Sequence, residues 1–514
     1  MQSARRRGAG APRDVVRWAE SGRGPVLVGV LALTALFRLP YVWSPLSSDE
    51  GGFLLVAHQW GTTDGSLYGN QWVDRPPGLL VLFRLADLGS GLLGDRVALR
   101  LVALVLALVA VAAAWFAGRV VGGARGALAA SLVMAAVTST PVFSGPRLMT
   151  AMPAVTFVTV CVALTLAATY EATTPRARAS LAAAAGVAGA TALMMKQNFA
   201  DGFVFAAVLW LLVGRRGWKL AAACAAGAAL PLLATLWWAA AGPGVGALWE
   251  AMYGFREQAV GVILGSSTVG PEARMRVFAL ALLGSGAVFL AAVTVWAGVR
   301  ERRRPIAVAT LAVAAYAVVG IAGGGSWWRH YALQLALPLS LGAALAIRSG
   351  LVRVVRVTVG LTLVSTLVGV LWLAPAAVQG RPSSGTAVGE WIRERAVAGD
   401  AGLVAYGSPQ VLRVAGLYAP YPYSWSLPVR VRDPDLEQMT ALLDGAHAPE
   451  WLVEMGSFTW WGIDTAAFDD AVATRYREVA DVCGHRVFLR ADVVRDLGAT
   501  TWCPSLYGRT TPES

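Results

Sequence analysis

Residues 97–118 read VALRLVALVLALVAVAAAWFAG, and Arg100 is the one charged residue among them. A helix needs about 20 apolar residues to cross the hydrocarbon core of a bilayer. Comparable apolar blocks recur at 25–43, 126–142, 153–170, 218–241, 276–299, 305–322, 331–347 and 354–375. Charged residues make up 14% of the chain, against about 25% in soluble domains. The sequence therefore predicts an α-helical polytopic membrane protein and excludes a disordered chain, a coiled coil and an ordinary cytosolic enzyme.

A further apolar block at 181–213 is interrupted by Lys196-Gln197-Asn198. Each half has about 15 residues, or about 22 Å of helix, which is short for a span but suits a hairpin of two half-buried helices. The loops before and after the block are both basic. Because basic loops stay in the cytoplasm, the block must cross the membrane an even number of times. We count it as two spans, which gives about eleven transmembrane helices.

The distribution of charge also predicts the orientation. Residues 1–24 contain a cluster of arginines, so we expect a cytoplasmic basic N-terminus followed by a membrane anchor rather than a cleaved signal. An odd number of spans then places the C-terminal region outside the cell. The formal net charge of +12 arises largely in short loops, so it indicates membrane topology and no nucleic-acid partner. The Ala-, Gly- and Arg-rich composition is typical of a GC-rich bacterium, so we expect a multi-pass protein of the bacterial plasma membrane.

The predicted transmembrane domain covers 25–378 and includes three outer loops, at 44–96, 242–275 and 323–330. The first loop is long enough for two amphipathic helices on the outer membrane face, and the second has the pattern of an interfacial helix. Residues 379–514 are predicted to form a small extracytoplasmic α/β domain, with strands at 402–407, 450–456 and 485–492 and helices at 386–397, 435–445 and 465–476. Cys483 and Cys503 lie in this domain, where oxidising conditions allow a disulfide, so we expect a bridge between them rather than a zinc site.

Two adjacent carboxylates, Asp49 and Glu50, follow the first span at the outer membrane surface. A carboxylate at that depth is costly and often functional, because it can deprotonate a hydroxyl or hold a metal. Ser47-Ser48-Asp49-Glu50 before an apolar helix is also good capping chemistry. Both interpretations remain open on these residues alone.

A second motif starts at Tyr68 and ends in Asp74-Arg75-Pro76-Pro77-Gly78. The two prolines stiffen the chain and prevent an earlier helix start. An arginine fixed in this way can bind a phosphate with two hydrogen bonds. The alternative is a rigid turn that carries a solvated Asp–Arg pair.

The order of these motifs resembles the GT-C glycosyltransferases, in particular the group of the protein O-mannosyltransferases and the lipid A aminoarabinose transferase. The first outer loop is similar to that group's DE…G…LY…D-basic-P-P-G pattern. Lys196-Gln197 resembles its KQ pair. GGGSWWRHYALQLALP resembles its entry into a late span, through Gly324, Gly325, His330, Tyr331, Gln334 and Pro338.

The resemblance implies an inverting enzyme that moves a sugar from a polyprenyl-phosphate carrier to a hydroxyl of a lipid, cell-wall glycan or protein acceptor. It implies that Asp49 is the base and that Glu50 supports it or a metal. The leaving lipid phosphate needs cations, and Arg75, Arg147, Lys196 and His330 are the candidates. The resemblance adds Asp74, Gln197 and Tyr331 to the expected substrate-binding residues. Trp327 and Trp328 are either interface anchors or sugar platforms.

One loop departs from the family. Many members carry a second acidic residue between the third and fourth spans, where this chain has Arg147 and no carboxylate. A divalent metal needs several oxygen ligands, so the resemblance leaves a metal cofactor open. Two alternative functions also remain, namely a transporter or flippase of lipid-linked glycans and a catalytically inactive relative. A transporter is ranked lower because the chain shows no internal repeat.

Overall fold

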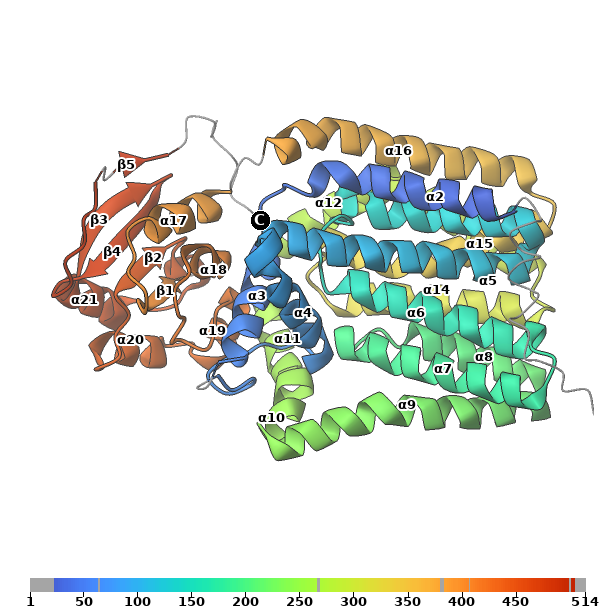
Figure 1. The fold of residues 1–514 in the computed structure, drawn as a ribbon, viewed down its shortest axis with the longest axis horizontal. Helices are drawn as coiled ribbons and strands as arrows, with labels where there is room; N and C mark the ends of the chain where they lie inside the picture. The colour runs from blue at the N-terminus through green and yellow to red at the C-terminus, as the bar shows by residue number, and fades with distance from the viewer. Residues whose placement is uncertain are drawn as a thin grey trace, which may run out of the picture.

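The structure is a computed structural model that describes residues 23–62, 65–265, 269–379, 383–405, 407–498 and 501–503. A long helical bundle forms one end of the molecule and a small domain with a β-sheet forms the other (Figure 1). Between them lies a layer of short helices that includes α3 (Ser48–Trp60) and α4 (Pro77–Leu93). The predicted cytoplasmic segment 1–24 lies almost entirely outside the described residues.

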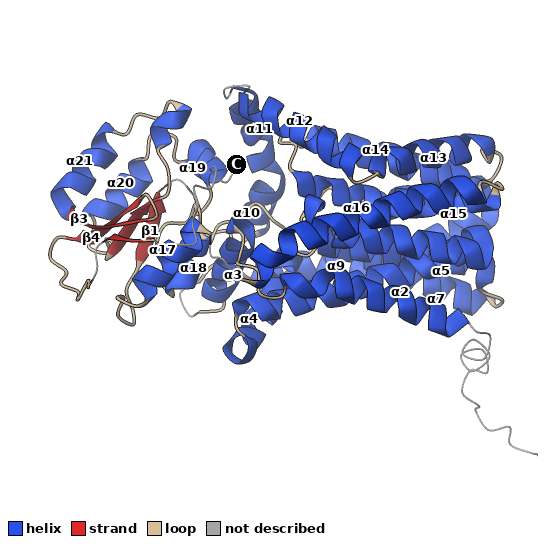
Figure 2. Ribbon diagram, turned by 90° about the horizontal axis from the view of Figure 1, so that it is seen from above, coloured by secondary structure: helices blue, strands red, loops and turns tan. Residues whose placement is uncertain are grey.

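The helical bundle contains every apolar block that the sequence predicts. Among the described residues, eight helices are long and apolar enough to cross a membrane, or nine if the bent pair α12 and α13 counts as one span. The bounds are α2 (Arg23–Arg38), α5 (Asp95–Ser139), α6 (Ala151–Leu166), α7 (Pro175–Met195), α8 (Asp201–Val213), α9 (Arg215–Ala241), α12 (Val269–Gly284), α13 (Ala287–Arg300), α14 (Pro305–Gly323), α15 (Ala336–Arg348) and α16 (Val352–Val378). The neighbouring helices run alongside one another in both views (Figures 1 and 2).

The predicted number of spans is eleven, and two helices explain why fewer are counted. Helix α5 is counted once although it contains two predicted spans, and α8 is too short to be counted. The 45-residue α5 is broken at Gly122 and Gly123, whose backbone angles are not helical. A Cβ on Gly118 would lie 2.6 Å from the Cβ of Ala130, so the halves fold back as a hairpin. Helix α8 has only 13 residues. The expected hairpin of two equal halves at 181–213 is therefore unequal, because α7 begins earlier, at Pro175.

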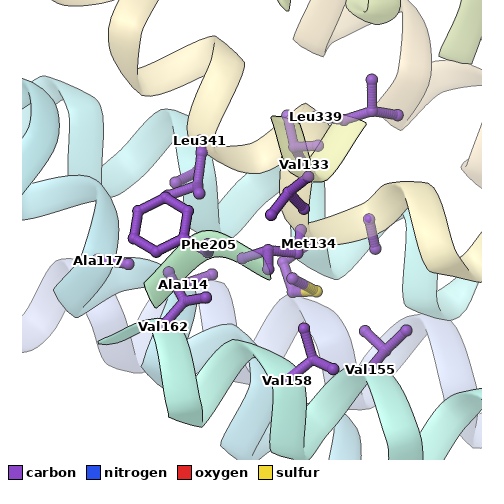
Figure 3. Close-up of a cluster of buried hydrophobic side chains, with 14 of the residues drawn as sticks. Ala114, Ala117, Val133, Met134, Val155, Val158, Val162, Phe205, Leu339 and Leu341 are labelled. Carbon is purple, nitrogen blue, oxygen red and sulfur yellow. The ribbon is translucent and has the colours of Figure 1, made fainter. Parts of the chain in front are cut away.

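The core of the bundle is packed mainly with small and branched side chains. Val133 and Met134 of α5 meet Val155 and Val158 of α6 and Leu339 of α15 (Figure 3). Helices α7 and α9 approach closely at glycines, since a Cβ on Gly186 or on Gly227 would lie 1.9 Å from a carbonyl oxygen of the other helix. Lipid tails are as apolar as these side chains, so close packing rather than hydrophobicity holds such helices together.

The outer segments differ from the expected pair of surface helices. Helix α4 matches the expectation, because Val81, Leu85, Leu88 and Leu92 remain exposed on one side. Helix α3 does not, because most of its residues are buried on all sides. It packs between α4 and helix α18 (Gln410–Ala415) of the C-terminal domain. The second outer loop forms α10 (Val245–Trp249), a π-helical turn (Glu250–Gly254) and α11 (Phe255–Gly265).

The C-terminal domain contains a five-stranded mixed sheet in the order β1-β2-β4-β3-β5. Its strands are β1 (Gly402–Ala405), β2 (Trp451–Glu454), β3 (Tyr476–Val482), β4 (His485–Arg490) and β5 (Thr501–Trp502). Besides α18, its helices are α17 (Ser384–Arg393), α19 (Ser426–Arg432), α20 (Glu437–Asp444) and α21 (Ala466–Arg475). The sequence located β1, β2, β4, α17, α20 and α21 but missed the remainder. A disulfide joins Cys483 to Cys503.

The C-terminal domain is attached to the membrane-proximal helices by partly buried charges. Arg413 of α18 forms ion pairs of 2.8 Å with Asp87 of α4 and with Asp95 at the start of α5. Asp87 also accepts a hydrogen bond from Arg84. These contacts fix α18 against the second half of α4 and the start of α5.

Candidate active site

The first turn of α3 presents Asp49 and Glu50 through a capping box. Ser47 is the N-cap, its hydroxyl accepts a hydrogen bond from the backbone N–H of Glu50, and the Glu50 carboxylate accepts one from the backbone N–H of Ser47. The capping interpretation of the sequence is therefore confirmed for Glu50. Because consecutive residues of a helix point in different directions, Asp49 is directed elsewhere.

Glu50 is a structural residue in this arrangement. It is fully buried and paired with Arg100 of α5, and it also accepts a 2.8 Å hydrogen bond from the backbone N–H of Leu148. Burial opposes its ionisation, but Arg100 and Arg147 outweigh burial and hold the pKa of Glu50 below its usual range. A carboxylate with all of these partners has no room for a substrate or a metal. The geometry therefore does not support the predicted catalytic or metal-supporting role of Glu50.

Arg147 lies on the same side as Glu50. Its charge acts on the Glu50 carboxylate, and its loop is held from below by Arg38, whose guanidinium donates to the carbonyls of Thr138, Gly145 and Pro146. Arg147 therefore lies beside the buried Glu50–Arg100 pair and not in the group of residues around Asp49.

Asp49 faces a different set of groups. Its Oδ1 accepts a 3.1 Å hydrogen bond from the indole Nε1 of Trp425, which comes from the C-terminal domain. Arg75 and Asp74 are close enough to act electrostatically on the same carboxylate. Burial raises the pKa of Asp49, and Arg75 and the Trp425 hydrogen bond offset only part of that effect. A carboxylate of raised basicity near a group of cations is suited to accepting a proton.

The Asp74-Arg75-Pro76-Pro77 turn holds its charged residues in a fixed position. The hydroxyl of Tyr68 donates a 2.8 Å hydrogen bond to the carbonyl of Arg75, and α4 starts at Pro77. Asp74 is paired with Arg75 at 2.7 Å and also with Arg256 of α11. These two cations outweigh the effect of burial and hold the pKa of Asp74 below its usual range. The Nε atom of Arg75 is buried and has no hydrogen-bond partner among the described residues.

Lys196 and Gln197 reach the same cluster from the loop between α7 and α8. The Lys196 ammonium lies 4.2 Å from the ring centre of Tyr331 and 5.3 Å from that of Phe199. Burial, together with the charges of Arg75 and Arg256, lowers the pKa of Lys196 to about 7. Gln197 donates 3.3 Å hydrogen bonds to the carbonyls of Asp74 and Met252, so it ties this loop to both outer segments.

His330 and Tyr331 enter from the short 3-10 helix Arg329–Leu335 that precedes α15. Their rings meet edge to face with centres 4.9 Å apart. His330 lies close enough to interact electrostatically with Lys196 and Arg75, and Tyr331 with Asp49, Asp74, Arg75 and Arg256. The motifs of the first outer loop, the 196–197 loop and the late span are therefore assembled at one place.

The sequence analysis missed three residues of this cluster, namely Arg256, Arg274 and Trp425. Arg256 pairs with Asp74, while Arg274 donates to the carbonyl of Ser326 and lies 4.8 Å from the ring centre of Trp328. Trp327 packs on Phe278 of α12, 5.9 Å between ring centres, so it belongs to the bundle. Arg256 stands beside Glu257 and Gln258 at the start of α11, so its sequence context gave only the signal of an ordinary polar helix turn. No sequence signal pointed to Trp425.

The described residues do not provide a metal site. They contain no group of three His, Cys, Asp or Glu side chains placed to hold a metal ion. Of the two carboxylates near Asp49, Glu50 is bound by Arg100 and Asp74 by Arg75 and Arg256. A divalent cation prefers several free oxygen ligands, and this donor set has one.

Comparisons with known proteins agree with this arrangement at the level of fold. No family model and no curated protein sequence matches the chain. The structure of ArnT from Cupriavidus metallidurans bound to undecaprenyl phosphate is similar over 91% of this chain and 98% of that chain, with a TM-score of 0.60 and 14% identity. The Archaeoglobus fulgidus oligosaccharyltransferase tethered to an acceptor peptide is similar over 90% and 73%, with a TM-score of 0.56 and 13% identity. The chain therefore has the fold of the GT-C membrane glycosyltransferases.

Proposed function

We propose that this protein is a membrane glycosyltransferase that moves a sugar from a polyprenyl-phosphate carrier to a hydroxyl acceptor. The observation that carries the proposal is that one carboxylate of raised basicity, Asp49, faces Arg75 while Lys196 and Arg256 lie beside the same cluster. Such a site holds a proton acceptor and a phosphate-binding group together. The fold shared with ArnT and the archaeal oligosaccharyltransferase supports it.

The reaction follows from the charges. The acceptor hydroxyl gives its proton to Asp49 while its oxygen forms a bond to the anomeric carbon of the sugar. The bond from that carbon to the phosphate oxygen breaks, and the lipid phosphate leaves with the electron pair. Arg75, Lys196 and Arg256 stabilise the charge that develops on the phosphate. Attack opposite the leaving group inverts the anomeric carbon.

The residues of the cluster have distinct parts in this proposal. Asp49 is the base, and the three cations bind the phosphate. Asp74 and Gln197 hold Arg75, Arg256 and the 196–197 loop in place, and His330 and Tyr331 border the Lys196 ammonium. Glu50, with Arg100, fixes the first turn of α3. We assign Arg147 to the support of Glu50.

The carrier class follows from the cationic site and from the neighbours. The ArnT structure contains undecaprenyl phosphate, and a structure of the archaeal oligosaccharyltransferase AglB contains dolichol-phosphate. An oligosaccharyltransferase structure also contains zinc. Because the carboxylates near Asp49 are paired with arginines, a metal does not fit here, and we assign no step to one.

The orientation completes the proposal. We infer that the N-terminus is cytoplasmic and that the site and the domain at 379–514 lie on the outer face of a bacterial plasma membrane. The basic loops between spans support this orientation. Acceptors on that face include lipids, cell-wall glycans and proteins.

The experiment uses membranes that contain the full-length protein or its Asp49→Asn variant. A panel of radiolabelled undecaprenyl-phosphate sugars serves as donors, and incorporation into lipid, glycan and protein fractions is counted. We expect the variant to lose about 10²- to 10⁴-fold in rate, the usual contribution of a general base. Its folding is checked by thermal unfolding, and its donor binding by retention of labelled undecaprenyl phosphate. Equal transfer by both proteins overturns the assignment of Asp49, and no transfer by the wild-type protein from any donor favours a flippase or an inactive relative.

A further inference from the structure

The segment of the C-terminal domain that leads into α19 lies against the catalytic end of α3. Trp425 donates its indole N–H to Asp49 Oδ1 at 3.1 Å. The Trp425 ring also packs on Phe53, one turn further along α3, with ring centres 5.2 Å apart. Phe53 is in turn packed on Phe83 of α4, at 5.4 Å. The indole is therefore held by aromatic packing from behind while its N–H points to the carboxylate.

Helix α3 has the sequence needed for this close approach. A Cβ on Gly52 would lie 2.4 Å from Cζ2 of Trp425 and 2.5 Å from Cγ of Pro409. A Cβ on Gly51 would lie 2.4 Å from the Cβ of Gln410. Glycine inside a helix costs roughly 0.5–1 kcal/mol relative to alanine, so two in succession call for a structural reason. That reason is the contact between α3 and the C-terminal domain.

We propose that Trp425 is a positioning residue that aims the Asp49 carboxylate at the acceptor, so that the C-terminal domain forms part of the catalytic site. This inference rests on the glycosyltransferase function proposed above. Among the described residues, the indole is the one hydrogen-bond donor to Asp49. It occupies Oδ1 and fixes the rotation of the carboxylate, which leaves Oδ2 for the acceptor hydroxyl. A base must lie within hydrogen-bond reach of its proton in a fixed geometry.

The electrostatic surroundings of Asp49 give a measurable consequence. Burial, Asp74 and Glu50 raise the pKa of Asp49, whereas Arg75 and the Trp425 hydrogen bond lower it. Arg256 and Lys196 are the other charges of the cluster. Loss of the indole N–H removes one of the groups that favour the ionised form. The pKa of Asp49 then rises further, and the base becomes protonated at a higher pH.

The first test is the pH dependence of kcat/KM in Trp425→Phe, measured with the undecaprenyl-phosphate sugar that is active in the panel. Phenylalanine keeps an aromatic ring against Phe53 but has no donor. We expect the acidic limb to move up by about half a unit to one unit, the size that corresponds to one ordinary hydrogen bond. We also expect the plateau to fall about tenfold, because the carboxylate is less well aimed. Trp237→Phe, on the exposed face of α9, is the matched control and should match the wild type.

Gly52→Ala tests the same contact from the other side. The new methyl group displaces the indole without removing any polar atom, so we expect the same shift of the acidic limb. Gly91→Ala on α4 is the control, since a Cβ there meets nothing within 4 Å. Purified variants are compared by thermal unfolding so that a folding defect is recognised.

The possible outcomes distinguish a failure of the Trp425 inference from a failure of the proposed glycosyltransferase function. If Asp49→Asn is inactive but Trp425→Phe has the wild-type pH profile and plateau, Trp425 is only a packing residue and the inference is wrong. If Asp49→Asn is as active as the wild type, the proposed function itself fails. A shifted acidic limb in both Trp425→Phe and Gly52→Ala supports the inference.

Discussion

Two clusters of charged residues begin at consecutive positions of α3 but differ in how their charges are satisfied. The Glu50 cluster consists of Glu50, Arg100 and Ser47, and the Asp49 cluster consists of Asp49, Asp74, Arg75, Lys196 and Arg256. Arg100 and Glu50 are both almost fully buried, and each bonds to several partners. Around Asp49 the cations outnumber the anions, with Arg75, Lys196 and Arg256 near Asp49 and Asp74. The Glu50 carboxylate has its hydrogen-bonding positions filled by protein donors, which stabilises the fold, whereas the cations around Asp49 can also bind an anionic ligand.

The largest expected effect is in the Glu50 cluster. Arg100→Leu leaves the Glu50 carboxylate buried without its counterion, which typically costs about 3–5 kcal/mol of stability. We expect a marked drop in the thermal unfolding temperature of the purified protein. The double variant Arg100→Leu/Glu50→Leu should recover part of the loss, since it leaves no buried carboxylate without its ion-pair partner. A double variant less stable than the single one would contradict this account of the pair.

A smaller effect is expected on ligand binding in the Asp49 cluster. Arg256→Gln removes one phosphate-binding cation and exposes Asp74 to the ligand. A hydrogen bond to a charged group contributes about 1.5–3 kcal/mol, so we expect affinity for undecaprenyl phosphate to fall about 10- to 100-fold. Equilibrium binding of labelled undecaprenyl phosphate measures the change. Arg303→Gln, at an exposed arginine between α13 and α14, should bind as the wild type, and unchanged binding by Arg256→Gln would remove Arg256 from the site.

The smallest effect is a change in pH dependence. The pKa of Lys196 is lowered to about 7, so its ammonium is present below that pH and is lost as the pH rises through it. If the ammonium binds the phosphate, kcat/KM falls on the alkaline side of about 7. Arginine stays protonated, so Lys196→Arg should abolish the alkaline fall while the acidic limb stays in place. An unchanged alkaline limb would assign that ionisation to another group.

The sequence predicted those features that depend on local patterns. Apolar blocks identified the helices, and the separate blocks 97–118 and 126–142 lie on either side of the break at Gly122 and Gly123. Ser47 to Glu50 identified a capping box, although the pattern could not show which carboxylate was buried. The position of α3 could not be predicted, because its burial depends on α18 and Trp425, which are more than 350 residues away in sequence.

The residues of the site also differed in whether the sequence could identify them. Arg75, Lys196 and His330 were identified by motif. Arg256 and Trp425 have no local signature, and only the folded chain brings them to Asp74 and Asp49. Strand β3 was missed because Tyr476–Val482 follows a helix directly and a bulge between Glu478 and Ala480 interrupts its alternation of buried and exposed residues.

The ion pairs of Arg413 with Asp87 and Asp95 determine how the chain can be divided. They join the C-terminal domain to α4 and α5 at two points on one guanidinium. A truncated protein that ends after α16 would leave both carboxylates without this counterion and would uncover Phe53 and the glycine face of α3. The two parts are therefore not interchangeable modules, and chimaeras that exchange the domain at 379–514 need the matching pair of aspartates to remain folded.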